Sequence, residues 1–412
     1  MEKEKIIVAI DIGTSKVTTV VGEIDELGDL HIIGFGEAKS KGIDKGIITN
    51  RNETIKSIRE SVNLAETTSG FKIVDAIVNV GGQHIEFQND KEFLTFGVSQ
   101  KEITHEDIES LHAKVISKVS KENYEIIHAL AKRYIIDDEN DVLDPEGMIA
   151  SKLEAEFHII LDKQTSYYNL KRVIEAAGIN PVKFVANPVA SATSVLYNEE
   201  KEMGVILLDI GAGTTDMAIY VEGAIEYTKS IPIGGNQITM DIAHRFKVSK
   251  EDAETLKKEY GVAIVEAVEP EETISIYPRG YEEAVEINKS LLVETIEARL
   301  LDIFDLIKKE LQLTQLLGKV NAGIVITGGV ANIPHIKTLA EASFGTDIRI
   351  GRPKDYRGFS EKLSFPQYAT SIGMLNILRN DNSFSSSLDM KQNSNFFDML
   401  KKFAETVRSW FY

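Results

Sequence analysis

One short segment occurs twice in this chain of 412 residues, once in each half. The first copy, residues 8–21, reads VAIDIGTSKVTTVV, and the second, residues 207–220, reads LLDIGAGTTDMAIY. In both, an apolar run leads into Asp-Ile-Gly, then small hydroxyl residues, then β-branched residues. Strand-like runs on either side of a glycine turn are typical of a β-hairpin. Each copy therefore predicts a strand, a glycine turn and a second strand.

Both turns contain the residue types that bind phosphate. Glycines let backbone N–H groups approach an anion, hydroxyls add donors, and a lysine adds positive charge. Mg²⁺ keeps several waters and needs few carboxylates, so Asp11 and Asp209 are candidate ligands through water. Either copy alone could be an ordinary β-turn, but the pair favours a nucleotide held from two sides. The candidate phosphate-binding residues are Gly13, Thr14, Ser15, Lys16, Gly211, Gly213, Thr214 and Thr215.

Two further segments are candidates for binding the adenosine of a nucleotide. In GIVITGGVANIPHI, a strand runs into Gly328, Gly329 and Val330, and a helix is expected to begin near 331–334. A glycine pair lets a base or ribose lie against the backbone, although an ordinary strand–helix turn has the same pattern. In DAETLKKEYG, Glu254 and Lys257 lie three residues apart and share one helix face. They could bond ribose and base, or form a solvated ion pair.

Composition excludes several classes of function. The net charge of −18 repels phosphate backbones, so broad nucleic-acid binding is not expected. The absence of cysteine removes disulfides, cysteine-ligated zinc and thiol nucleophiles. The short apolar run of the N-terminus resembles neither a signal peptide nor a membrane span, and no run of 18 apolar residues occurs.

The last 18 residues, NFFDMLKKFAETVRSWFY, predict an amphipathic helix after a polar linker over 380–394. Charges between the apolar residues prevent the helix from spanning a bilayer, and the aromatic end favours the lipid interface. The segment carries only one net positive charge, so a membrane anchor would be mainly hydrophobic. The alternative is a helix docked on the protein's own core. The candidate membrane-binding residues are Phe396, Phe397, Leu400, Phe403, Val407, Trp410 and Phe411.

These elements occur in the order found in the actin-like ATPase superfamily, whose duplicated lobes would explain the repeat. Within it, three segments resemble the FtsA family of bacterial cell-division proteins. They read HALAKRYIIDDENDVLDPEGMIASKLEAEFHII, YYNLKRVIEAAGINPVKFVANPVASATSVL and SIPIGGNQITMDIA. The resemblance implies an α/β, actin-like two-lobe fold with duplicated ribonuclease-H-like domains and an inserted small α+β domain.

The resemblance also implies a division into domains. The first lobe comprises 1–81 and 162–203, interrupted by the inserted domain at 82–161, and the chain returns to this lobe at 362–379. The second lobe comprises 204–235 and 305–361, interrupted by a small subdomain at 236–304. The linker at 380–394 and the amphipathic helix at 395–412 follow.

The implied function is an ATP- and Mg²⁺-binding scaffold of the Z ring. Such a protein polymerises, tethers FtsZ filaments to the cytoplasmic face of the membrane at the division site, and contacts other division proteins. The 236–304 subdomain would bind the FtsZ C-terminal peptide, with Lys289 and Arg299 as cations for an acidic peptide. Either cation could instead be solvated or internally paired. The alternatives are a PilM-like pilus-assembly adaptor and a sugar or acetate kinase.

The resemblance predicts slow or absent hydrolysis. Hydrolysing relatives place Gln or Glu where this chain has Asn187 followed by Pro188. Asparagine is shorter and is not a general base, and losing such a base costs ~10²–10⁴-fold in rate. Asn187 and Asp209 are therefore only weak catalytic candidates, and at most a weak ATPase is expected.

Overall fold

The structure is a computed structural model and describes residues 5–97, 100–119, 121–280 and 283–380. Apart from Asn380, the linker predicted over 380–394 and the predicted membrane-binding residues, from Phe396 to Phe411, lie outside the described residues. Asn380, the first residue of the predicted linker, is instead the last residue of a helix. Within the described residues, no helix is both long and apolar enough to cross a membrane.

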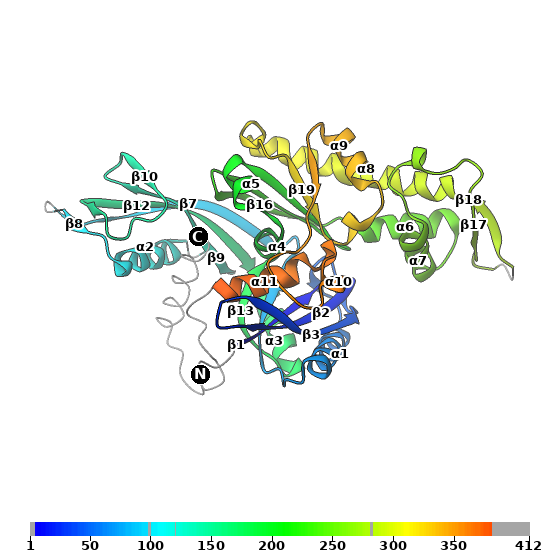
Figure 1. Cartoon of the computed structure of the whole chain (residues 1–412), viewed down its shortest axis with the longest axis horizontal. Helices are drawn as coiled ribbons and strands as arrows, with labels where there is room; N and C mark the ends of the chain where they lie inside the picture. The colour runs from blue at the N-terminus through cyan, green and yellow to red at the C-terminus, as the bar shows by residue number, and fades with distance from the viewer. Residues whose placement is uncertain (1–4, 98–99, 120, 281–282, 381–412) are drawn as a thin grey trace.

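Two five-stranded sheets form the centres of the two lobes (Figure 1). In spatial order, the first contains β13 (Asn180–Ala186), β6 (Asp75–Val80), β1 (Lys5–Ile12), β2 (Lys16–Ile24) and β3 (Leu30–Lys39). The second contains β20 (Ile348–Ile350), β19 (Ile324–Thr327), β14 (Val205–Ile210), β15 (Thr215–Val221) and β16 (Ala224–Ile231).

The second sheet repeats the first strand by strand. β1 pairs antiparallel with β2 and parallel with β6, and β14 pairs antiparallel with β15 and parallel with β19. The two echoed segments are therefore the first hairpin of each sheet. This duplication confirms the α/β, two-lobe fold that the family resemblance implied.

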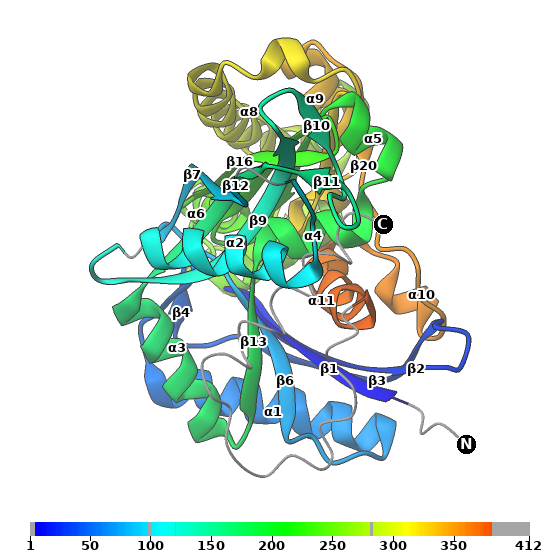
Figure 2. The ribbon, with the colours of Figure 1, turned by 90° about the vertical axis from the view of Figure 1, so that its left-hand side faces the viewer.

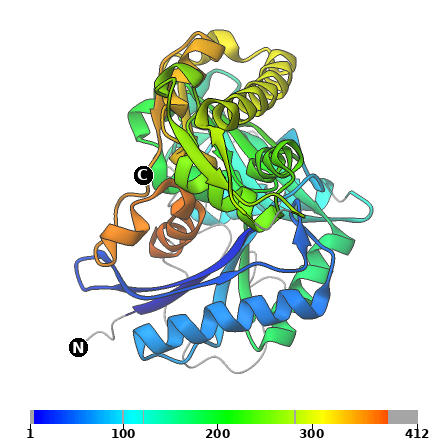
Figure 3. The same cartoon turned by 90° about the vertical axis from the view of Figure 1, so that its right-hand side faces the viewer.

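Helices cover the outer faces of both sheets. In the first lobe, α1 (Arg51–Ser69) and α3 (Gln164–Ala177) pack together, and α1 lies beneath the sheet (Figure 3). Asn50 caps the start of α1 and Gly70 ends it in the left-handed conformation. The second lobe carries α6 (Gly235–Phe246), α7 (Lys250–Tyr260), α8 (Lys289–Thr314), α9 (Ile336–Phe344) and the hairpin of β17 (Thr273–Ile276) and β18 (Val285–Asn288).

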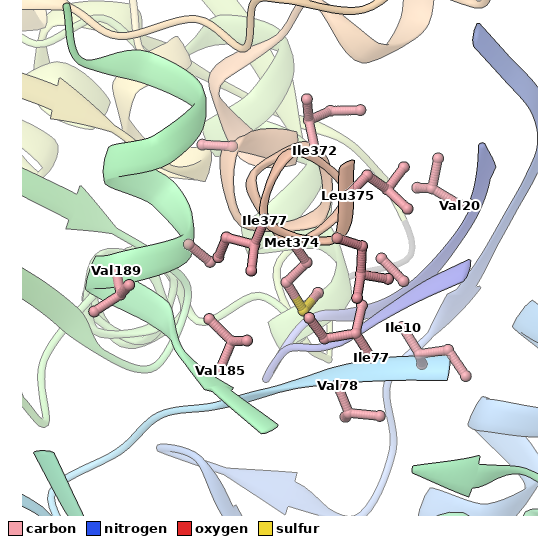
Figure 4. Packing of buried hydrophobic residues seen from close by; sticks show 14 of the residues in the cluster. Ile10, Val20, Ile77, Val78, Val185, Val189, Ile372, Met374, Leu375 and Ile377 are labelled. Carbon is pink, nitrogen blue, oxygen red and sulfur yellow. The ribbon is translucent and has the colours of Figure 1, made fainter. Parts of the chain in front are cut away.

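Two helices, α4 (Asn187–Val195) and α11 (Ala369–Asn380), pack against each other between the lobes. Figure 4 shows Met374 of α11 pointing toward Ile77 of β6 and Leu375 of α11 lying beside Val20 of β2, all within one buried apolar cluster. α4 begins at the residue after β13, so a strand of the first sheet runs directly into this contact. The remaining short elements are β4 (Ile43–Asp44), β5 (Ile47–Ile48), α5 (Asn198–Met203) and α10 (Ser360–Leu363).

A further sheet projects from the first lobe (Figure 2), and its strands lie between β6 and α3 in the sequence. It comprises β10 (Asn140–Val142), β9 (Tyr124–Ile136), β12 (Lys152–Lys163) and β7 (Ile85–Thr95), with α2 (His105–Lys118) against it and a small sheet of β8 (Lys101–Glu102) and β11 (Ile149–Ala150). Leu111 and Val115 of α2 and Phe157 of β12 belong to a separate hydrophobic core. We call this unit the inserted domain.

Candidate functional site

The two echoed hairpins meet at a cleft of about 510 Å³ between the lobes. This volume is within the range of ligand pockets in proteins. Each turn is closed by the same bond: Gly13 N donates to Lys16 O (3.0 Å), and Gly211 N donates to Thr214 O (2.9 Å). A Cβ atom on Gly213 would lie 2.6 Å from Thr14 Oγ1, so the two turns approach each other closely. The repeat thus supplies two equivalent turns to one site.

Most of the sequence-predicted site residues line this cleft. From the first hairpin they are Asp11, Gly13, Thr14, Ser15 and Lys16; from the second, Asp209, Gly211, Gly213 and Thr214; and from the other segments, Asn187, Glu254, Lys257, Gly328, Gly329 and Val330. Thr215 does not line the cleft, because it is fully buried and its Oγ1 donates to Ile233 O (2.9 Å).

Of the two equivalent aspartates, Asp209 is buried and Asp11 is partly buried, and both receive a hydroxyl donor from α11. Asp11 accepts from Asn79 Nδ2 (2.9 Å) and Ser371 Oγ (3.1 Å). Asp209 accepts from Ser191 Oγ and, at 3.2 Å, from Thr370 Oγ1. The helix between the lobes therefore positions one carboxylate of each lobe.

The environment of the aspartates disfavours their charged form. Burial raises the pKa of Asp11 to about 6, although Lys16 opposes the shift, and burial raises the pKa of Asp209 to about 7. The negative charge of Asp216 adds to both increases, and its own pKa is raised by burial. A cation at the cleft would offset this repulsion.

Mg²⁺ fits the site when bound through its waters. Among the described residues, Asp216 Oδ1 is buried without a hydrogen-bond partner, and three aspartates, Asp11, Asp209 and Asp216, border the cleft. In the described part of the chain, no group of three His, Cys, Asp or Glu residues is placed to ligate a metal directly. Asp11 and Asp209 would therefore hold hydrated Mg²⁺, as expected for an ion that keeps most of its water shell.

Asn187, at the start of α4, bridges the two lobes. Its Oδ1 accepts from Asn79 Nδ2 (3.0 Å), and its Nδ2 donates to Asp216 Oδ2 (2.9 Å). A Cβ atom on Gly81 would lie 2.2 Å from Asn187 Nδ2, so little space surrounds the amide. An amide held in this way positions its neighbours and does not accept a proton from water.

Lys16 and Lys257 border the cleft but already have partners. Lys16 Nζ bonds Glu37 (2.8 Å) and lies 3.6 Å from the centre of the Tyr368 ring. Lys257 Nζ pairs with Glu254 (2.6 Å), as in the alternative for these two residues, but the Lys257 side chain is only 11% exposed, so the pair is not a solvated one. The pair lines the cleft nonetheless, so a nucleotide would compete for both side chains.

The glycine segment differs from expectation in one respect. Gly328 has φ of 86°, and a 3-10 helix covers Gly329–Asn332. The α-helix starts at Ile336, after the region 331–334 where it was predicted, because a 3-10 turn and Pro334 precede it. A Cβ atom on Gly328 would lie 2.4 Å from Asp209 Oδ1, so this turn also packs directly against the second phosphate hairpin.

The two predicted partner-binding cations lie on α8, outside the residues that line the cleft. Lys289 pairs with Glu272 at 2.7 Å, and Arg299 pairs with Asp241 at 2.5 Å. Arg299 also contacts Asp302 at 3.2 Å. The internal ion pair, which was the alternative for both residues, is therefore what the structure contains. An acidic peptide would have to displace these carboxylates or add to the network.

Sequence reasoning missed several residues of the cleft. Asn79 links Asp11 to Asn187 through its Nδ2, and Asn79 Oδ1 accepts from Ile12 N (2.7 Å). Ser371 and Thr370 contact the two aspartates, and Glu37 and Tyr368 hold Lys16. The one available signal for Asn79 was a polar residue inside the apolar strand DAIVNV.

Two family models and several known proteins match this sequence. A family model described as "Cell division protein FtsA" matches residues 206–373, and one described as "SHS2 domain inserted in FTSA" matches residues 82–161. Cell division protein FtsA of Pseudomonas aeruginosa is 34% identical and covers 91% of this chain and 89% of its own length. FtsA of Borreliella burgdorferi is 33% identical and covers 98% of both chains.

Solved structures share the fold at low identity. A PilM–PilN type IV pilus biogenesis complex is 14% identical with a TM-score of 0.64, covering 90% of this chain and 98% of its own. MreB5 of Spiroplasma citri bound to ADP is 16% identical with a TM-score of 0.56, covering 92% and 99%. These neighbours have the actin-like fold, and the relatives carry the family: this chain belongs to the FtsA family of cell-division proteins.

Proposed function

We propose that this chain binds ATP and Mg²⁺ between its lobes and acts as a polymerising scaffold that tethers FtsZ filaments to the cell membrane. The observation that carries the proposal is the meeting of two equivalent phosphate-type turns, one from each lobe, at one cleft that Asp11 and Asp209 both line. The printed names of the relatives support a role in cell division, and MreB5 structures described as bound to ADP and AMPPNP support a nucleotide in this fold.

In this proposal, each part of the cleft has its own task. Backbone N–H groups at Gly13–Ser15 and Gly211–Thr214 bind phosphate, and Asp11 and Asp209 hold hydrated Mg²⁺. The Gly328–Val330 turn with Glu254 and Lys257 binds adenosine. Because these groups come from both lobes, a nucleotide stabilises the arrangement in which the turns face each other. Asn187 lacks the chemistry of a general base, so ATP mainly serves as a structural ligand.

The rest of the chain supplies the attachments. Residues 236–304 bind the FtsZ C-terminal peptide, and residues 82–161 take part in self-association and contacts with other division proteins. Residues 395–412 lie in the lipid interface on the cytoplasmic face of the membrane at the division site. One amphipathic helix binds weakly, whereas a polymer presents many and gains affinity through multivalency.

Fluorescence of Trp410, the one tryptophan in the sequence, tests the membrane anchor. We expect a blue shift when liposomes of anionic and zwitterionic lipid are added. The shift should persist in moderate salt, because burial of large apolar side chains, roughly 1.5–3 kcal/mol each, outweighs a single net charge. A spectrum already blue in buffer and unchanged by lipid would show that the helix docks on the protein. The variant Phe403→Glu, which replaces one of the candidate membrane-binding residues, should abolish the shift.

An FtsZ C-terminal peptide tests the partner surface. Reversing charge in Arg299→Glu should weaken binding at least ~10-fold, the effect of losing about 1.4 kcal/mol of interaction. Lys337→Glu is a matched control, since Lys337 also forms an exposed helical ion pair, with Glu341 of α9. If both variants bound the peptide with equal affinity, Arg299 would not belong to the peptide-binding surface. A chain that ignored the FtsZ peptide and bound a pilus-assembly peptide would instead act as a PilM-like adaptor.

A further inference from the structure

The inserted domain contacts the second lobe as well as the first, to which it is covalently joined. Its strands β7, β9 and β12 all pack against β16, the edge strand of the second sheet. An edge strand leaves one row of backbone groups unpaired, and proteins commonly cover such an edge. Here, Asn89 Nδ2 of β7 donates to the backbone oxygen of Glu226 in β16 (3.2 Å).

An ion pair reinforces this contact. Lys132 of β9 pairs with Glu226 of β16 at 2.5 Å, and Lys132 also lies 3.6 Å from Glu156 of its own sheet. The Lys132 side chain is only 9% exposed, so its charge is largely desolvated and depends on these carboxylates. A buried charge left without its partner is strongly destabilising. Separation of β16 from the inserted domain therefore has a free-energy cost.

A buried histidine makes the third contact. His158 of β12 lies between Asn89 Oδ1 (2.7 Å from Nδ1) and Thr228 Oγ1 of β16 (3.0 Å from Nε2). Burial lowers the pKa of His158 to about 3, so the ring is neutral at neutral pH. Phe87 stacks on this ring at 5.0 Å between ring centroids and meets Tyr227 of β16 edge-on at 4.7 Å.

The same domain also bonds to the edge strand of the first sheet. His128 Nε2 of β9 accepts from the backbone N–H of Ala186, the last residue of β13, at 3.0 Å. Burial lowers the pKa of His128 to about 3, which keeps this nitrogen free to accept. Ala186 immediately precedes Asn187 of the cleft. On the other side, Ser230 of β16 pairs with Asp216 in the ladder, two residues beyond Thr228.

We propose that the inserted domain is a clamp that joins the edge strands β13 and β16 and restrains the angle between the two lobes. The lobes are also connected through α4 and α11 and by side-chain pairs such as Lys39 of β3 with Glu251 of α7 (2.7 Å), and the clamp adds to these contacts. Each clamped strand reaches the cleft within a few residues, and a strand rises ~3.3 Å per residue. A movement of the inserted domain therefore displaces backbone close to the phosphate turns. The residues that make these contacts do not line the cleft, so the inference stands apart from the proposed function.

Pulsed electron–electron double resonance, which measures the distance between two spin labels, tests the clamp in the ligand-free protein. The sequence contains no cysteine, so Asn63→Cys on α1 and Thr338→Cys on α9 provide the only labelling sites. The clamp variant combines Glu226→Gln with Thr228→Val, which removes the ion pair and the histidine contact while keeping side-chain size. The matched control is Asp141→Asn with Thr255→Val. Asp141 pairs with Arg133 inside the inserted domain, and Thr255 bonds its own helix.

We expect one narrow interlobe distance distribution in the unmodified protein and the control, and a distribution at least twice as wide in the clamp variant. Glu226→Gln alone serves if the double variant fails to fold, and should show a smaller broadening. A second label pair, Ser117→Cys with Thr338→Cys, reports separation of the inserted domain from the second lobe. An unchanged Asn63–Thr338 distribution overturns the clamp, whether or not the Ser117–Thr338 distribution broadens.

Discussion

Replacing Asp209 with asparagine should stabilise the ligand-free protein and abolish Mg²⁺-dependent ATP binding. Asp209 is buried beside two other carboxylates, and burial raises its pKa from 3.8 to about 7. Asparagine has nearly the same shape, and its Oδ1 can still accept from Ser191 and Thr370, as Asp209 does. It carries no charge, however, so it removes repulsion in the empty cleft and also removes the group that would attract the cation.

The pH dependence follows from the sign of this shift. A carboxyl group with a raised pKa in the folded state contributes stability that is complete below its unfolded pKa, near 4, and is lost as pH rises through 7. The gain from Asp209→Asn should therefore be absent near pH 4 and reach on the order of 2–4 kcal/mol above pH 7. Urea unfolding at pH 8 and pH 4.5 measures this gain, and titration calorimetry measures ATP binding.

Asp302→Asn is the matched control for this experiment. Asp302 is 63% exposed and shares Arg299 with Asp241, so its replacement should change stability by less than about 0.5 kcal/mol. If Asp209→Asn lowered stability at pH 8, the aspartate would not be destabilised by burial as its surroundings indicate. If the variant bound ATP with unchanged Mg²⁺ dependence, Asp209 would not hold the ion.

The hairpins and their aspartates were predictable because everything that defines them is local. Strand-forming residues, a glycine turn and an aspartate at its entrance all lie within fourteen positions of each copy. Repetition then carried information that neither copy has alone, since the pair favoured a nucleotide held from two sides, and the resemblance to actin-like ATPases supplied the two equivalent sheets. The strand orders of those sheets agree with this inference.

The contacts of the side chains were not predictable, because their partners come from distant parts of the chain. Asn79 is joined to Asp11, and Ser371 reaches Asp11 from the far end of the chain. Lys289 and Arg299 stood out in the sequence as cations, yet each has an acidic partner that only folding brings near. Charge in a sequence therefore indicated a possible binding residue without showing whether an internal carboxylate already held it.

The contact between α4 and α11 sets the position of the whole cleft and depends on one residue without a side chain. A Cβ atom on Gly373 of α11 would lie 1.8 Å from the carbonyl oxygen and 2.5 Å from the carbonyl carbon of Ala190 in α4. Backbone atoms cannot rotate away, so the two helices would have to separate. At the same contact, Ser194 Oγ donates to Ala369 O (2.7 Å), and Ser191 and Thr370 share a hydrogen bond (3.0 Å).

Gly373→Ala should destabilise the protein by about 3 kcal/mol despite improving helix propensity. Alanine in a helix interior is favoured over glycine by ~1 kcal/mol, whereas overpacking a close contact costs ~1–3 kcal/mol and sometimes more. A clash with rigid backbone lies at the upper end of that range. Gly318→Ala is the control, because a Cβ atom there would meet nothing within 4 Å. Urea unfolding of both variants measures the difference, and a Gly373→Ala protein as stable as its parent would contradict the packing argument. ATP affinity should fall as well, since moving α11 withdraws Thr370 and Ser371 from the two aspartates of the cleft.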